Sequence, residues 1–173
     1  YSTDGLCWVP VKSSTRIMTK GFCVEWGEDM WLVGGHKTLD GNFTGLSTIA
    51  YSYNGIDWEM VSGPQIATNV QDIKWNGKIF VAVGNGTNHT IAWSSNGTNW
   101  HGCGDDEFTT AGRGIAYSDK LNIWVAVGNG GNTIAYSTDA INWTGVGTSI
   151  FSSVGYGVHY NGERFVAYGT GTN

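Results

Sequence analysis

The stretch IFVAVGNGTNHTIAWSSNGTNW, residues 79–100, decides the fold class of this chain. It begins with a short apolar run, passes through a loop rich in Gly, Asn and Thr, and continues with a second short run, IAWS, at 91–94. Short apolar runs bounded by Gly and Asn are typical of β-strands joined by turns. An Asn-Gly pair then leads to Trp100, and this dipeptide favours the tight turn of a hairpin. The stretch therefore predicts three antiparallel strands.

The same pattern recurs along the chain. The turn motif is found as YSTDGLCW (1–8), YSYNGIDW (51–58), WSSNGTNW (93–100) and YSTDAINW (136–143). The apolar run is found as MWLVGG (30–35), IFVAVG (79–84), IWVAVG (123–128) and RFVAYG (164–169). A further short run precedes it as FCVEW (22–26), DIKW (72–75), GIAY (114–117) and GVHY (157–160). Each repeat therefore predicts four short strands, which we call A to D.

The repeat length indicates the architecture. The tryptophans that close the turn motifs are 42 and 43 residues apart in the later copies, and 50 apart in the first, where the loop 36–48 is longer. Four antiparallel strands every 42–43 residues are the signature of a β-propeller blade. We therefore expect an all-β fold, a β-propeller with four blade equivalents of four antiparallel strands each.

The turn between strands C and D is expected to be a two-residue type I′ turn, with strand D ending at the tryptophan. Asp-Gly and Asn-Gly suit this turn because both central positions need positive φ. Asp139-Ala140 departs from the rule, so we expect that turn to be strained or of another type. Trp58, Trp100 and Trp143 are predicted to be buried.

The order of the strands bears on domain organisation. Residues 1–173 are predicted to form a single domain. If the ring closes, residues 155–173 give the inner strands of the last blade and residues 1–9 give its outer part. The alternative is that the chain is an excerpt of a longer propeller built from the same repeat.

Composition excludes several classes of protein. The net charge of −5 disfavours nucleic acid as a partner, because phosphate binding needs a basic face. No apolar run approaches the roughly 18 residues that a membrane helix needs, so no membrane insertion is expected. The three cysteines, Cys7, Cys23 and Cys103, form no CxxC pair, and neither a disulfide framework, a metal site nor a cofactor is predicted.

The turn motifs resemble the Asp-box (BNR) repeat of sialidase-like β-propellers and the repeats of photosystem assembly-factor propellers. They are also similar to repeats of uncharacterised proteins in bacteria and large DNA viruses. The copies here have one residue fewer between Ser and Trp, lack the Thr before Trp, and carry Asn54 and Asn96 where the box has Asp. The resemblance implies that such boxes lie on turns away from the catalytic face. Asp4 and Asp139 are therefore interpreted as turn formers.

Enzyme chemistry finds little support in the sequence. A sialidase-like site would need three arginines on one carboxylate, but Arg16, Arg113 and Arg164 fall on different connections and are not expected to converge. The acidic run 105–107 is interpreted as a solvated loop. We therefore expect the protein not to be an enzyme.

The predicted function is binding. Loops B-to-C and D-to-A share one face of a propeller, and here they are neutral and rich in amides, which suit hydroxyl-rich ligands. The candidate ligand-binding residues are His36, Asn85, Asn88, His89, Asn129 and Asn132. The expected partner is a glycan or a protein surface. The alternatives are a structural or assembly component of a virion or cell surface acting through protein contacts, and a degenerate sialidase-like hydrolase. Five Asn-x-Ser/Thr sequons permit an extracellular or virion-surface location without establishing it.

Overall fold

The computed structural model describes residues 1–11, 18–36, 47–63, 66 and 68–171. Fourteen β-strands and no helix occur among these residues. The predicted all-β class is therefore confirmed.

The strands fall into four consecutive units that follow the repeat. Unit 1 contains β1 (Lys20–Gly27), β2 (Met30–His36), β3 (Ile49–Ser52) and β4 (Glu59–Met60). Unit 2 contains β5 (Asn69–Trp75), β6 (Phe80–Asn85), β7 (Ile91–Ser94) and β8 (His101–Gly102). Unit 3 contains β9 (Ala111–Ser118), β10 (Ile123–Asn129), β11 (Ile134–Ser137) and β12 (Thr144–Gly145). Unit 4 consists of β13 (Val154–Tyr160) and β14 (Phe165–Thr170).

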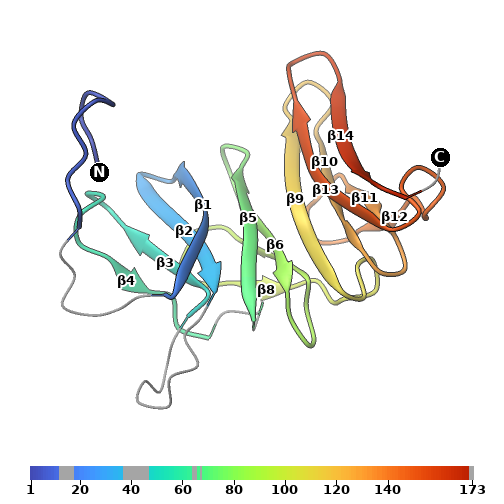
Figure 1. The fold of residues 1–173 in the computed structure, drawn as a ribbon, viewed down its shortest axis with the longest axis horizontal. Helices are drawn as coiled ribbons and strands as arrows, with labels where there is room; N and C mark the ends of the chain where they lie inside the picture. The colour runs from blue at the N-terminus through green and yellow to red at the C-terminus, as the bar shows by residue number, and fades with distance from the viewer. Residues whose placement is uncertain (12–17, 37–46, 64–65, 67, 172–173) are drawn as a thin grey trace.

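Within each unit every strand pairs antiparallel with the next one along the chain. Units 1 and 2 are also joined through one residue pair, His36 with Asn69. The first strands of neighbouring units lie next to one another, and the units stand side by side along an open arc (Figure 1). The two termini lie at opposite ends of this arc, so a closed four-bladed ring is not observed.

The turn motif folds in a different way from the prediction. The short fourth strand of a unit begins after the tryptophan, not before it, as β8 does after Trp100. In the turn of unit 2 the Ser94 hydroxyl accepts the Gly97 N–H at 2.9 Å, and the Asn96 side-chain oxygen accepts the Asn99 N–H at 2.9 Å. Only Gly97 has positive φ, at 73°, so the turn is not type I′. The predicted strand D and its turn type were wrong, because side chains rather than a hairpin ladder satisfy the backbone here.

All four copies of the motif use the same bonds. Asp4 and Asp139 each accept two backbone N–H groups, so their interpretation as turn formers is confirmed. A hydrogen bond from the Asn142 side-chain amide, together with these backbone bonds, holds the pKa of the Asp139 carboxyl well below its usual range. Ala140 takes the position that is glycine in the other copies and has φ of 66°, which agrees with the predicted strain.

The core lies between neighbouring units because alternate residues of a strand point to opposite faces. Phe80 and Ala82 of β6 pack toward unit 1, whereas Val81 and Val83 of the same strand pack toward unit 3. Each interior unit is thus apolar on both faces. We call the face toward the preceding unit the front and the face toward the following unit the back.

Aromatic rings repeat at one position of every unit. The same pair of rings, one from each of the first two strands, occurs in every unit, with centroids between 4.2 and 4.9 Å apart: Trp26–Trp31, Trp75–Phe80, Tyr117–Trp124 and Tyr160–Phe165. Trp100 is buried as predicted, but Trp58 and Trp143 are only half-buried. Trp143 packs against the core between units 2 and 3 and is still half-buried, so a preceding unit does not by itself bury this ring.

Candidate functional site

A β-bulge at one repeated position shapes the concave face of the arc. The first strand of each unit carries one extra residue relative to the second strand, and these residues are Phe22, Gln71, Arg113 and Tyr156. A bulge leaves its residue out of the ladder and redirects its side chain. The four units therefore present four different side chains at one level of the concave face.

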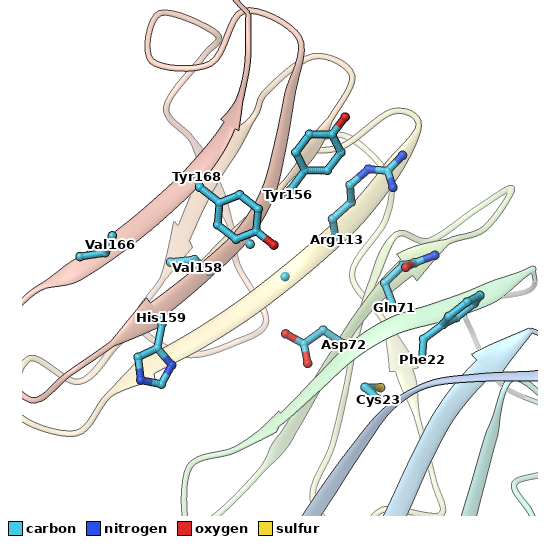
Figure 2. A pocket seen from close by; sticks show the side chains of 12 residues that line it. Phe22, Cys23, Gln71, Asp72, Arg113, Tyr156, Val158, His159, Val166 and Tyr168 are labelled. Atoms are coloured by element: carbon cyan, nitrogen blue, oxygen red, sulfur yellow. The ribbon is translucent and has the colours of Figure 1, made fainter.

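These four side chains line a single hollow of about 480 Å³. Its walls also include Cys23, Asp72, His159 and Tyr168. Figure 2 shows Asp72 from unit 2 and Tyr168 from unit 4 reaching into the space, with Arg113 beside Tyr156. Hollows of this size, lined by aromatic rings and a few polar groups, are typical of small-ligand sites.

Arg113 is the cation of this hollow and is held in place by its neighbours. Its Nε donates to the Asn129 side-chain oxygen at 3.3 Å. Its guanidinium carbon lies 5.7 Å from the centre of the Tyr156 ring, within the range of a cation–π contact. These two contacts hold the guanidinium group of Arg113 beside Asn129 and Tyr156.

Asp72 ties two units together from within the same wall. Its Oδ2 accepts the Ile115 N–H at 3.0 Å, which links β5 to β9, and its Oδ1 accepts the Ile73 N–H at 3.0 Å. Burial raises the pKa of the Asp72 carboxyl to about 6, although these two bonds act in the opposite direction. Both oxygens therefore accept a backbone N–H, and the Oδ2 bond joins units 2 and 3.

A comparable tie links units 1 and 2. Glu25 accepts the Trp75 N–H at 2.9 Å and lies 3.3 Å from the Lys74 ammonium group. Between units 3 and 4 the first strands come close instead: a Cβ on Gly114 would lie 3.0 Å from the Gly157 Cα. The concave wall is thus a connected surface across all four units.

The cysteines of the cores are poor nucleophiles. Burial raises the pKa of the Cys23 thiol to about 12 and that of Cys103 to about 11. A thiol must ionise to attack, so neither is activated. Cys7 lies exposed near the N-terminus.

None of the six candidate residues from the sequence lines this hollow. His36, Asn85 and Asn129 end the second strands of units 1 to 3, and each pairs with the first residue of the bulged strand. Asn129 contacts the hollow through Arg113. The His36 ring lies 3.3 Å from the Thr19 hydroxyl, and Asn88 is exposed on its loop.

His89 and Asn132 occupy equivalent positions and hold their own loops. The His89 Nδ1 accepts the Gly104 N–H at 2.8 Å, and the Asn132 side-chain oxygen accepts the Gly147 N–H at 2.8 Å. The Asn132 amide also donates to the Glu107 carboxylate at 3.0 Å. One of the three acidic side chains at 105–107 therefore helps to hold the loop. These two side chains fasten the loop between the second and third strands to the segment after the fourth.

Sequence reasoning missed the bulged residues. From the sequence, Arg113 is interpreted only as one arginine of a carboxylate clamp with Arg16 and Arg164, and the three are not expected to converge. Arg164 lies at the turn between β13 and β14, far along β13 from Tyr156, and Arg16 lies outside the described residues. A signal was present, because Phe, Gln, Arg and Tyr differ at one register position, whereas the position two residues further on is β-branched in every unit: Val24, Ile73, Ile115 and Val158.

No protein-family model matches the chain, and no curated protein matches it. Within the described part of the chain, no three His, Cys, Asp or Glu side chains form a group that could hold a metal ion. The described residues also include no helix long and apolar enough to cross a membrane. The Asp-box resemblance stays a hypothesis, and the function has to be argued from the concave hollow.

Proposed function

We propose that the protein is a non-catalytic β-propeller-type binding module that recognises glycans on its concave face. The observation that supports this is the repeated bulge, which brings Phe22, Gln71, Arg113 and Tyr156 from four units into one hollow. A fold that only needed to pack would not require four unlike side chains at one repeated, redirected position.

The chemistry of these side chains fits a sugar. Phe22 and Tyr156 are exposed aromatic rings, which can cover the apolar face of a pyranose. Arg113 and Gln71 add N–H donors, and the Gln71 oxygen and Tyr156 hydroxyl add acceptors, so vicinal hydroxyls can be bonded in pairs. The two aromatic rings come from units 1 and 4, and the two N–H donors come from units 2 and 3 between them.

Catalysis is not part of the proposal. Glycosidases need two carboxyl groups on either side of the scissile bond. Asp72 is the carboxyl group that lines this hollow, and its two oxygens accept backbone N–H groups from β5 and β9. Its contacts support a structural role.

The second candidate is a structural or assembly component that acts through protein contacts. The observation that favours it is the set of exposed apolar side chains at the two ends of the arc, which include Val24, Trp26, Val166 and Tyr168.

A glycan array tests the first candidate. The unmodified protein should bind a restricted set of oligosaccharides, and Arg113→Ala should weaken that binding about tenfold or more, because a hydrogen bond to a charged group contributes about 1.5–3 kcal/mol. Arg164→Ala is the matched control: it removes the same charge from an exposed turn and should leave binding unchanged. Absence of binding to every glycan, or equal binding by the Arg113 and Arg164 variants, would contradict the proposal.

A further inference from the structure

The front of unit 1 exposes apolar side chains whose equivalents in units 2 and 3 are buried. Val24 on β1 is 58% exposed, whereas its equivalents Ile73 and Ile115 in units 2 and 3 are 1% and 2% exposed. Trp31 is likewise exposed, although its equivalents Phe80 and Trp124 are buried. In units 2 and 3 the back of the preceding unit covers these positions. The interfaces between consecutive units therefore indicate that the front of unit 1 fits the back of another unit.

The back of unit 4 has the complementary property. Val166 on β14 is 61% exposed, whereas its equivalent Val81 on β6 is fully buried against unit 3. Tyr168 is exposed too, and its equivalents Val83 and Val127 are buried. The two open ends are thus the two halves of an interface that the arc already forms three times.

Residues 1–9 fold as the outer half of another unit. The Tyr1 amino group and the Val9 carbonyl are 2.9 Å apart, and the Val9 N–H donates to the Tyr1 carbonyl at 2.8 Å. This pair corresponds to Tyr51 with Glu59 in unit 1, which joins β3 to β4. The turn between them has the same bonds as the other turn motifs. Residues 1–9 thus match the third and fourth strands of a unit, whereas β13 and β14 match the first and second.

The space beside residues 1–9 is open. A hollow of about 430 Å³ lies between Tyr1, Ser2 and Trp8 on one side and Val24 and Trp31 of unit 1 on the other. In units 2 and 3 the corresponding place, in front of the buried ring of the second strand, is filled by the preceding unit. The front of unit 1 and the outer half-unit therefore frame a place for two inner strands.

We propose that β13 and β14 of a second copy of this chain fill that place, so that one complete four-stranded unit is built from two molecules. The first copy supplies the outer half, residues 1–9, and the second supplies the inner half. The two halves of one chain lie at opposite ends of its arc (Figure 1), and a second copy carries the complementary half. The proposal does not depend on the glycan site.

The register of this pairing follows from unit 3. There Ser137 pairs with Trp124 and Tyr136 with Val125. The equivalent pairs across two copies are Ser2 with Phe165 and Tyr1 with Val166. Val166 and Tyr168 also border the concave hollow, so the second copy closes the side of that hollow next to unit 4.

The contact is heterologous, because the front of one copy meets the back of another. Such an interface repeats from copy to copy and gives rings or filaments, whereas a symmetric dimer would use one face twice. This difference supplies the test.

Light scattering on the full chain at several concentrations is the experiment. The unmodified protein should show a mass above the monomer value of 18.6 kDa that rises with concentration. Val24→Asp blocks the front and Val166→Asp blocks the back, so each variant alone should be monomeric. An equimolar mixture of the two should form a dimer, because it still contains one intact front and one intact back. Val146→Asp, at another exposed valine, should behave as the unmodified protein.

Each alternative has its own outcome. A monomer at all concentrations, whether the arc stays open or closes on itself, overturns the proposal. Assembly of either single variant alone, or a mixture that stays monomeric, overturns it as well. Because Val24 and Val166 are exposed, aspartate is compatible with the folded chain, and Val24→Lys with Val166→Lys repeats the test with the opposite charge. Unchanged urea midpoints for the variants verify that they are folded.

Discussion

Gly97→Ala is expected to destabilise the chain in two ways, through backbone strain in its turn and through overpacking of the core between units 1 and 2. Gly97 has φ of 73° in the turn of unit 2, where an L-residue is strained by about 1–2 kcal/mol. A Cβ there would lie 2.6 Å from Sδ of Met30 and 3.4 Å from Cδ2 of Leu32, and both side chains are buried in the core between units 1 and 2. Overpacking of a core costs about 1–3 kcal/mol more. The sum is about 2–5 kcal/mol.

Gly55→Ala is the matched control for this change. Gly55 has nearly the same φ, 72°, in the same turn of unit 1, but a Cβ there would meet only the edge of the exposed Trp31 ring, at 3.6 Å. The control should lose only the backbone strain of about 1–2 kcal/mol. Urea unfolding followed by tryptophan fluorescence gives both values. If the two variants lose the same free energy within about 0.5 kcal/mol, the turn of unit 2 does not pack against unit 1 in the way described.

Three further changes test other parts of the structure. Trp100→Ala should cost about 3–5 kcal/mol in the free energy of unfolding, because Trp100 is 6% exposed and lies in the core between units 1 and 2; a loss under about 1 kcal/mol in urea unfolding would contradict this packing. The pKa of Asp72 is raised to about 6 in the fold. The native state therefore keeps a proton that the unfolded chain releases near pH 4, and the free energy of unfolding should fall as the pH rises from about 4 to 6. In Asp72→Asn this fall should be smaller, and an identical pH profile of the urea midpoint would refute the assignment. His89→Ala should lower the unfolding midpoint because it removes the acceptor for the Gly104 N–H, whereas Asn88→Ala at the exposed neighbouring position should leave it unchanged.

The hydrophobic pattern of the sequence was enough to predict the strands. The runs IFVAVG and IWVAVG alternate between two buried faces, and β6 and β10 form there with aromatic partners from the preceding strand. Local side-chain chemistry was enough for Asp4 and Asp139, because their oxygens reach N–H groups only two and three residues away. Such contacts join residues that are close in the sequence, so a short repeated motif is enough to predict them.

The position of strand D could not be predicted in this way. Asn-Gly and Asp-Gly favour a type I′ hairpin, but Ser94, Asn96 and the Trp100 indole together satisfy the backbone of a longer turn. The tryptophan ring donates to the Gly97 carbonyl at 2.8 Å, so it closes the turn and the strand can only begin after it. A dipeptide preference was outweighed by three side-chain bonds.

The sequence by itself thus determined the all-β class, the four-fold repeat and the faces on which apolar residues lie, because these follow from strand periodicity and turn chemistry. Only the tertiary structure decided which of those faces are covered. Val24 and Ile73 occupy equivalent positions of the repeat, but Ile73 is buried because unit 1 packs against it, whereas Val24 is exposed. The tertiary structure also decided the candidate site. Phe22, Gln71, Arg113 and Tyr156 are far apart in the chain and meet because a bulge at one register position redirects each of them and the arc brings the four first strands side by side.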